Sequence, residues 1–557
     1  MRGGFRSGLL PGLLLLPLLA LAGGLIYYLG RGTTFFFDEW NFILERRTGG
    51  VEAFLNPHGG HLSAVPVLVY RLLWSVVGLR HYGAFRATVI GVHLLCCVLL
   101  YLIARRRIGP VAALVPTALL LFLGSAWQDL LWPFQIGYLA SLAGGLAMIL
   151  MLDHPDTRHD LAAAGLLLLS LASSGLGIPF AAAALLGLVL TRRWRQLWMA
   201  LGPLALFGLW YLAYGRGSTD AQLSNLPRIP IYVARSMAAA AGGLVGLSGR
   251  WGAVIAVAGL VGLAAFAVRR RATSLRLLML IALPLVFWGL TALTRGQLGE
   301  PGASRYLYPG GLFLLLITVE VLAGLRLQPW MAVIPVLLVP AIVANVQLLH
   351  NGALGLRSVS TTVRAELGAV EIERRYVARD FRPDTQLMPQ VTAGPYLAAV
   401  DALGSPADPP GAIGATPEPV RASVDSVLER AEGLTLSTNV VGSAPDPNMT
   451  VDTSLGATVA RGPGGCVSIA ATQSLARVEL SVRGARLVIA AQHGPVTIWV
   501  RRFDRQYPDT PIGAVSPDDQ IIPTQARSIL FRPDGAPDFW HVALETSAQV
   551  SACALLP

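Results

Sequence analysis

The sequence predicts an α-helical polytopic membrane domain followed by an extracytoplasmic, mainly β domain of the sandwich or jelly-roll kind. The 557 residues are 54% hydrophobic and 13% charged, and this charged fraction is about half that of a typical soluble chain. Long apolar runs recur between residues 9 and 349 and then stop. From about residue 450 the pattern changes to short alternating strands separated by Gly, Pro and Asp.

The apolar runs predict about eleven transmembrane helices. The first is interpreted as a retained helix, because its apolar run is longer than a signal-peptide core and no clear cleavage site follows. Segments 62–79 and 231–247 are also apolar and are expected to lie in the membrane interface. If just one of these two segments crosses the membrane, the orientation of every later helix reverses. The predicted crossings are near 9–29, 84–104, 110–124, 138–152, 159–173, 176–191, 197–214, 251–268, 275–293, 306–325 and 329–349.

The charge distribution sets the predicted orientation. The net charge is +11. Residues 1–349 contain 26 Arg and 11 acidic residues, whereas residues 350–557 contain 17 Arg and 21 acidic residues. The positive excess therefore belongs to the membrane domain, where basic loops stay in the cytoplasm, and we expect no nucleic-acid partner. The basic groups that separate apolar runs are Arg105–Arg107, Arg192–Arg195, Arg269–Arg271 and Arg326. Placing them inside gives a cytoplasmic N-terminus and an extracytoplasmic C-terminal domain.

Three domains are expected: a membrane domain over 1–349 with a long first external loop at 31–85, a helical linker region over 350–445, and a β-rich domain over 446–557. Helices are predicted at 360–381 and near 420–432. Cys466 and Cys553 bracket the strands and would pair as a disulfide in an oxidising compartment, the alternative being two free thiols. Trp499 or Trp540 would offer a stacking surface to a polysaccharide, or else belong to the core.

The first external loop contains an acidic pair in the stretch GTTFFFDEWNF, where Asp38 and Glu39 stand among aromatic residues. A carboxylate that is partly removed from water at a helix exit becomes more basic and is suited to accept a proton. The alternative is that the pair hydrates a helix end while the aromatic residues form an interfacial belt.

The predicted orientation places further polar residues on the same external face as Asp38. Polar groups at membrane depth are costly and tend to mark function. In GSAWQDLLWPFQIG, Asp129 is the only charge and follows Gln128. Arg295 and Arg305 lie in TRGQLGEPGASRYLYPG, with Tyr306 next to the second arginine. An arginine here is suited to hold a phosphate by forked hydrogen bonds, or alternatively to extend its charge to the interface.

His58 and His61 complete the set of candidate substrate-binding residues. Their i, i+3 spacing would bring both rings to one metal ion on a helical turn. Gly59 and Gly60 between them disfavour a regular helix, so substrate contact or helix capping is the expected role. A divalent cation such as Mg²⁺, Mn²⁺ or Ca²⁺ that bridges Asp38 or Glu39 to a substrate phosphate is left open.

These residues and this topology resemble the GT-C class of integral-membrane glycosyltransferases, and in particular the actinobacterial arabinofuranosyl- and mannosyltransferases of cell-wall assembly. The chain is also similar to a group of actinobacterial multi-pass proteins with a DEW-type first loop. The resemblance implies a sugar transfer, with inversion, from a polyprenyl-phosphate donor to a cell-envelope acceptor at the external face of the bilayer. Asp38 would then be the general base, and Glu39 would assist it or hold a metal.

The resemblance also implies roles for the other charged residues. Arg305 and Arg295 would stabilise the departing phosphate, and Asp129 would orient one of the sugars. Two other functions stay open: a transporter or flippase for a lipid-linked or polar solute, and a non-catalytic scaffold of envelope assembly. A transporter is expected to show internal repeats with charges at the membrane midplane, whereas here the charges gather on one face and no convincing repeat is seen.

Overall fold

The computed structural model describes residues 6–154, 156–218, 221–270, 274–324, 333–462, 465–492, 494–516 and 526–556. The chain forms two compact units. The helical unit comprises Met1–Thr33 and Glu45–Arg357, and the C-terminal unit comprises Thr34–Leu44 and Ser358–Pro557. Arg271 and Arg326, two of the residues used for the orientation, lie outside the described part of the chain.

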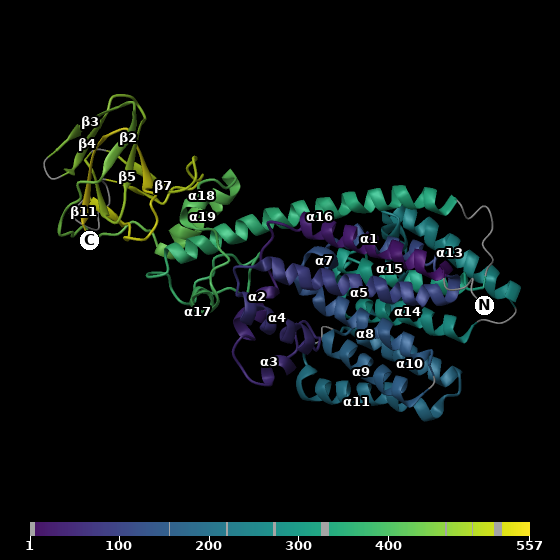
Figure 1. The fold of residues 1–557 in the computed structure, drawn as a ribbon. Helices are drawn as coiled ribbons and strands as arrows, with labels where there is room; N and C mark the ends of the chain where they lie inside the picture. The colour runs from purple at the N-terminus through teal and green to yellow at the C-terminus, as the bar shows by residue number, and fades with distance from the viewer. Residues whose placement is uncertain are drawn as a thin grey trace. The chain divides into compact units, whose positions relative to one another are not determined.

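The helical unit is built from α-helices joined by short turns (Figure 1). Within the described residues, seven helical segments are long and apolar enough to cross a membrane; the count of eleven crossings stays a prediction. The two segments expected in the interface form α4 and α12, of 14 and 16 residues, short of the ~20 that a full crossing requires. The helices are α1 Arg6–Leu29, α3 Glu52–Leu55, α4 Ala64–Val77, α5 Tyr82–Ile108, α6 Leu114–Leu121, α7 Trp127–Leu131, α8 Ile136–Leu152, α9 Thr157–Ser173, α10 Gly177–Leu190, α11 Trp198–Trp210, α12 Ile229–Leu244, α13 Gly249–Arg270, α14 Leu275–Arg295 and α15 Ser304–Val321.

Two sequence-based assignments differ from the structure. The stretch 124–137, predicted as an external loop, forms the 3₁₀ turn Gly124–Ala126, helix α7 and the 3₁₀ turn Pro133–Gln135. The helices predicted at 329–349 and 360–381 overlap one continuous helix, α16, over Val333–Ile372, while residues 329–332 lie outside the described residues and 373–381 are not helical. The polar residues near 350 suggested a boundary between two helices. This stretch has no proline to interrupt a helix, and single glycines are tolerated inside helices at a cost of about 1 kcal/mol each.

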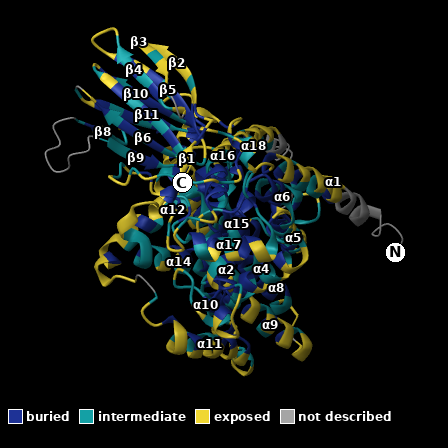
Figure 2. Ribbon diagram, turned by 90° about the vertical axis from the view of Figure 1, so that its left-hand side faces the viewer, coloured by how far each residue is buried: buried dark blue, intermediate teal, exposed yellow. Residues whose placement is uncertain are grey.

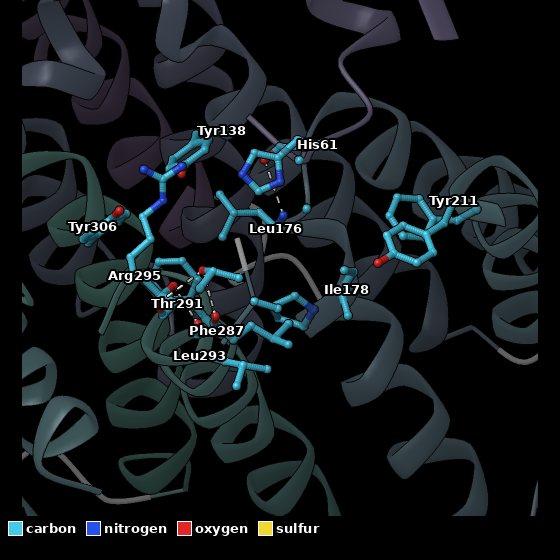
Figure 3. A pocket seen from close by; sticks show the side chains of 18 residues that line it. His61, Tyr138, Leu176, Ile178, Tyr211, Phe287, Thr291, Leu293, Arg295 and Tyr306 are labelled. Carbon is cyan, nitrogen blue, oxygen red and sulfur yellow. Dashed lines mark hydrogen bonds between the residues drawn. The ribbon is translucent and has the colours of Figure 1, made fainter. Parts of the chain in front are cut away.

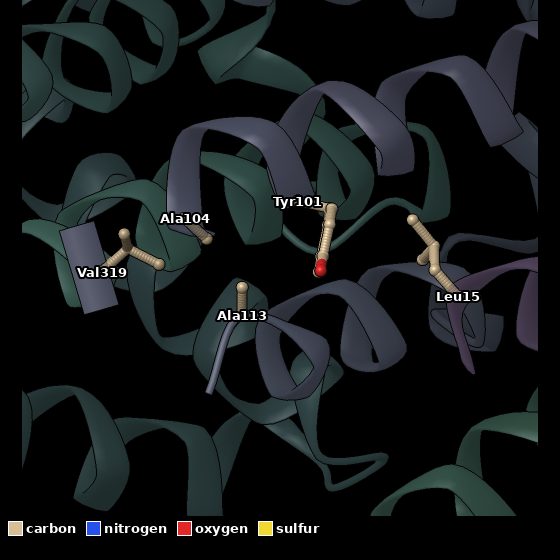
Figure 4. Close-up of a cluster of buried hydrophobic side chains, with 5 residues drawn as sticks. All are labelled: Leu15, Tyr101, Ala104, Ala113 and Val319. Carbon is tan, nitrogen blue, oxygen red and sulfur yellow. The ribbon is translucent and has the colours of Figure 1, made fainter. Parts of the chain in front are cut away.

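Apolar side chains fill the interior of the helical unit and also cover part of its outside. Leu15, Tyr101, Ala104, Ala113 and Val319 form one buried cluster where α1, α5 and α15 meet the start of α6 (Figure 4). By contrast, α11 leaves much of its surface exposed (Figure 2), and so does α13. An apolar helix face without protein neighbours is typical of contact with lipid.

The two ends of the helical unit carry different polar groups. At one end, Arg107 donates two hydrogen bonds to Glu320, at 2.8 and 2.6 Å. Asp153 pairs there with both Arg106 and Arg276. These residues come from the last turns of α5 and α15, the C-cap of α8 and the first turn of α14. The opposite ends of α14 and α15, with the start of α8, therefore meet at the other end of the unit.

The C-terminal unit contains two antiparallel sheets. One has the order β3-β4-β11-β6-β9 with β1 paired to β11, and the other has the order β2-β5-β10-β7-β8. Alternate residues are buried along β6 and β7, as expected where two sheets pack face to face. Cys466 and Cys553 form a disulfide. The strands are β1 Ala444–Pro445, β2 Thr450–Leu455, β3 Ala457–Arg461, β4 Val467–Ala471, β5 Ala476–Val482, β6 Arg486–Ala491, β7 Val496–Arg501, β8 Gly513–Val515, β9 Ala526–Leu530, β10 Trp540–Thr546 and β11 Gln549–Leu556.

Buried polar contacts join the sheets to helix α19 (Glu418–Glu432) of the same unit. The Asp425 carboxylate accepts hydrogen bonds from the backbone N–H groups of Arg502, Phe503 and Asp504 at 2.9, 2.9 and 3.0 Å. Arg502 in turn makes a two-pronged ion pair with Asp534 at 2.6 and 2.9 Å. These contacts satisfy charges that would otherwise be costly to bury, so they fix α19 to the turn after β7.

Two buried glutamates in this region predict that the stability of the C-terminal unit falls as pH rises. Burial raises the pKa of Glu373 to about 7 and that of Glu432 to about 8. Because both values exceed the unfolded value of about 4.3, their contribution is fully present below pH ~4 and is lost as pH rises through 7 to 8. We expect a loss of several kcal/mol between pH 5 and 8.5, measured by thermal unfolding.

Glu432→Gln is the matched variant for this pH dependence. One Glu432 oxygen accepts a hydrogen bond from the Arg532 N–H, and a glutamine oxygen can still accept it. The variant should flatten the dependence of the unfolding temperature on pH without unfolding the protein at pH 5. A wild-type unit that becomes more stable between pH 5 and 8.5 would contradict the prediction.

Candidate active site

A cavity of about 230 Å³ lies in the helical unit at the end where α14 finishes and α15 begins. Its wall combines aromatic, aliphatic and polar side chains that come from segments far apart in the sequence (Figure 3). The lining residues include His61, Tyr138, Gly175, Phe287, Arg295 and Tyr306. A largely apolar cavity with a few convergent polar groups is the usual form of a small-molecule site.

His58 and His61 are held by a tight turn rather than by a helix. The backbone N–H of each histidine donates to the carbonyl oxygen of the other, at 3.0 and 2.9 Å. Gly59 and Gly60 between them both have positive φ values, +54° and +82°. Two consecutive positive φ values define the type I′ turn, which glycine adopts without steric cost. The two glycines are therefore required by the turn, and His58 and His61 do not lie on a regular helix, as Gly59 and Gly60 led us to expect.

The turn sends the two imidazoles to different surroundings. The His58 ring packs edge-on against Phe134, with centroids 5.2 Å apart. His61 lines the cavity. Burial lowers the pKa of His61 to about 4, and the positive charges of Arg295 and His58 add to the shift. His61 is thus neutral at physiological pH and can donate or accept a hydrogen bond in the cavity.

Gly175, in the turn between α9 and α10, makes room for His61. A Cβ atom at this position would lie 2.7 Å from His61 Nδ1 and 3.1 Å from Cε1. We expect Gly175→Ala to displace the His61 ring and to raise KM about tenfold, because a ring held by the turn and the cavity wall has little freedom to move away. The measurement is KM in the transfer assay described below. Gly165→Ala is the control, because a Cβ there meets nothing within 4 Å.

Arg295 is the cation of the cavity. It is the last residue of α14, and its side chain is half-buried. No described acidic side chain forms an ion pair with its guanidinium, in contrast to Arg107 at the opposite end of the unit. Tyr306, buried against Phe287, and Tyr138 at the start of α8 complete this part of the wall (Figure 3). The arrangement is able to bind an anionic group between aromatic rings.

Arg305 and Asp129 lie in the neighbouring layer, where the N-terminus of α15 meets α7. The Arg305 guanidinium stacks over the Tyr306 ring at 5.0 Å and lies 4.0 Å from the exposed carboxylate of Glu300. Asp129 is fully buried, and neither of its carboxylate oxygens has a hydrogen-bond partner among the described residues. Arg305 lies close enough to Asp129 for the two groups to interact electrostatically. Arg305 thus connects the cavity wall, through Tyr306, to the buried acid.

Gln128 has a positioning role in this layer. Its backbone N–H donates to Ser304 Oγ at 3.1 Å, and its side-chain oxygen accepts from the Arg305 N–H at 3.2 Å. These two hydrogen bonds fix α7 to the first turn of α15. Arg305 and Tyr306 therefore start their helix at a defined place.

The acidic pair Asp38-Glu39 belongs to the C-terminal unit. Residues 34–44 are held there by the Phe37 N–H, which donates to the Leu387 carbonyl at 2.9 Å. The Trp40 and Tyr396 rings add an edge-on contact with centroids 5.7 Å apart. Trp40 is fully buried. Trp40 is therefore held inside the C-terminal unit.

The two carboxylates of the pair have different environments. Glu39 is fully buried at the first position of helix α2 (Glu39–Glu45), and its Oε2 accepts the Phe36 N–H at 3.2 Å. Asp38 is half-exposed, and it follows Phe37, whose φ of +50° is rare for a bulky residue. Strained backbone of this kind is concentrated at functional sites. Glu39 therefore has a structural contact, while Asp38 is the more accessible acid.

The sequence indicated His61, Arg295 and Tyr306 as site residues, and all three line the cavity. It did not indicate Tyr138, Phe287 or Gly175. The only available signal was the Gly/Pro break SSGLGIPF near Gly175, which a tight turn explains equally well. Of the two candidate stacking tryptophans, Trp540 is buried in the core of the C-terminal unit, whereas Trp499 is half-buried beneath Arg477.

The likeness of this chain to known proteins is one of structure and not of sequence. No protein-family model matches the chain, and no curated protein sequence matches it. Among solved structures, ArnT from Cupriavidus metallidurans, bound to undecaprenyl phosphate, aligns with 66% of this chain and 81% of its own. The identity is 16% and the TM-score is 0.42.

Proposed function

We propose that this chain is a membrane glycosyltransferase that moves a sugar from a polyprenyl-phosphate donor to a cell-envelope glycan, lipid or protein. The observation that carries the proposal is the half-buried Arg295, which has no acidic partner among the described residues and faces an aromatic cavity within an apolar helical unit. A guanidinium binds phosphate oxygens through paired hydrogen bonds, more strongly where water is excluded.

The proposed reaction is an inverting displacement at the anomeric carbon. An acceptor hydroxyl attacks this carbon, the bond to the phosphate oxygen breaks, and the polyprenyl phosphate leaves with the electron pair. Asp38 takes the proton of the attacking hydroxyl. Arg295, with Arg305 behind Tyr306, stabilises the charge that grows on the leaving phosphate, and such electrostatic stabilisation is usually the largest contribution to catalysis.

The remaining residues of the site bind and orient the substrates in this proposal. His61, neutral at physiological pH, hydrogen-bonds a sugar hydroxyl. Tyr138 and Tyr306 pack against the apolar face of the donor sugar, and Asp129 orients a sugar through Arg305. A divalent cation held by Asp38 and Glu39 fits less well, because Glu39 is buried and bound to the Phe36 N–H. The proposal therefore includes no metal step.

The test is a transfer assay in proteoliposomes with a panel of radiolabelled polyprenyl-phosphate sugars and an envelope extract as the acceptor. The expected result is release of polyprenyl phosphate together with label in the acceptor, for one sugar of the panel. The anomeric configuration of the product, determined by NMR, tests inversion. Label that crosses the bilayer with the donor intact would identify a transporter. If the folded protein shows neither turnover nor transport, the non-catalytic scaffold is the remaining function.

A further inference from the structure

We propose that the outer face of the sheet β2-β5-β10-β7-β8 holds a divalent transition metal of the zinc class, bound by Asp452, Glu479 and His541. One ligand atom from each of these residues lies within 4.8 Å of the others. Among the described residues, this is the one group of three His, Cys, Asp or Glu side chains with that spacing. The inference is independent of the proposed sugar transfer.

The strand register brings the three side chains together. His541 of β10 pairs directly with Ser481 of β5, and Glu479 lies two residues along β5 on the same face. On the other side of β5, the register of β2 shifts between Val451 and Thr453. Asp452 is the extra residue at this bulge. A bulge redirects a side chain out of the regular alternation, and here it turns the carboxylate toward Ser481 and His541.

The distances between ligand atoms fit a small tetrahedral ion. Zinc binds imidazole nitrogen and carboxylate oxygen at about 2.0–2.2 Å, which separates neighbouring ligand atoms in a tetrahedron by about 3.4 Å. His541 Nδ1 lies 3.1 Å from Asp452 Oδ2 and 3.6 Å from Glu479 Oε1. Ser481 Oγ, at 3.1 Å from His541 Nδ1 and 2.5 Å from Asp452 Oδ2, completes the group.

The ligand types decide the class of metal. One imidazole with two carboxylates suits Zn²⁺ and similar transition ions, whereas Ca²⁺ prefers six to eight oxygen ligands. The side chains are only partly exposed, at 30% for Asp452, 15% for Glu479 and 29% for His541. Three protein ligands leave one position for the Ser481 hydroxyl or for solvent.

Arg501 competes with the metal for Glu479. Its guanidinium donates to Glu479 Oε1 and also to the Asp504 carbonyl oxygen, the latter at 2.6 Å. It lies 4.8 Å from the centre of the Tyr507 ring. Because these two other contacts remain when Glu479 turns to a metal, Arg501 weakens the site without closing it. Removing Arg501 should therefore strengthen zinc binding, whereas removing a ligand such as His541 should weaken it.

The bound ion would fasten the edge strand β2 to β5 and β10. Strand β2 is mostly exposed and has a partner strand on one side only. A ligand that binds the folded state alone raises its stability with concentration. We therefore expect the C-terminal unit to unfold at a higher temperature when zinc is present.

The experiment is isothermal titration of the full chain in detergent with ZnCl₂, with the disulfide oxidised and no chelator or thiol present. We expect one zinc ion per chain, at least a hundredfold weaker binding in His541→Ala, and tighter binding in Arg501→Gln. His81→Ala, at an exposed histidine of the helical unit, is the control and should bind like wild type.

Several outcomes separate this site from its alternatives. Zinc binding that His541→Ala leaves intact, or that His81→Ala removes, would overturn the proposal. So would weaker zinc binding in Arg501→Gln, because the arginine would then support the site rather than compete. If the chain binds Ca²⁺ as tightly as Zn²⁺, the carboxylates attract cations in general and the proposed zinc site is wrong. If His541→Ala fails to fold, Glu479→Gln takes its place. Zinc binding by Glu479→Gln with the wild-type stoichiometry and affinity would then overturn the proposal.

Discussion

Arg295→Gln is expected to lower kcat about 10²–10³-fold, the cost of removing one preorganised charge-stabilising donor. The guanidinium is half-buried beside Tyr138 and Tyr306, so water does not fully replace it. The effect should fall more on kcat than on KM, because charge on the leaving phosphate is greatest in the transition state. The transfer assay with the donor sugar identified from the panel measures both constants.

Two further variants sharpen this prediction. Arg295→Lys keeps the positive charge but loses the fork of donors, so it should recover only part of the rate. Arg250→Gln removes an arginine from the exposed start of α13 and should leave transfer unchanged. If all three variants transfer sugar at the wild-type rate, the cavity is not the site of the reaction. An Arg295→Gln chain that fails to bind the donor at all would assign Arg295 to ground-state binding.

The sequence could group candidate site residues at one end of the predicted helices, because that grouping depends on topology. Arginine clusters between apolar runs assign an end of the bundle to each loop, and this reasoning put His61, Arg295 and Tyr306 on the same face. The structure brings these three residues to one cavity. No spacing rule was needed, only the order in which the helices alternate.

The site residues that could not be predicted from the sequence are those whose roles depend on tertiary contacts. Tyr138 and Phe287 sit in apolar helices and look like any core residue until their neighbours are known. The role of Gly175 depends on a tertiary contact, because a Cβ atom at this position would lie 2.7 Å from Nδ1 of His61, which stands more than a hundred residues earlier in the sequence. Similarly, the different burial of the neighbours Asp38 and Glu39 could not be predicted from the sequence, because the first turn of α2 buries the Glu39 carboxylate and leaves Asp38 half-exposed.

The difference between these two acids gives the second large effect. Asp38→Asn is expected to lower kcat about 10²–10⁴-fold, the usual contribution of a general base, with little change in KM. Glu39→Gln should retain most of the activity, because an amide oxygen can still accept the Phe36 N–H that Glu39 holds at 3.2 Å. Glu39→Ala removes that acceptor from a fully buried position and should mainly lower stability.

The comparison of these variants decides which acid is the base, since all three change the same short segment. Activity lost in Asp38→Asn and kept in Glu39→Gln supports Asp38 in that role. The reverse pattern would assign the proton transfer to Glu39. In that case the buried Glu39 side chain would have to become accessible when substrate binds. Equal losses in both, with unchanged unfolding temperatures, would mean that the pair acts as one unit, as two carboxylates sharing a charge or a metal would. Full activity in Asp38→Asn would keep the transferase but place its base elsewhere, and the buried Asp129, with no hydrogen-bond partner among the described residues, would be the next carboxylate to test.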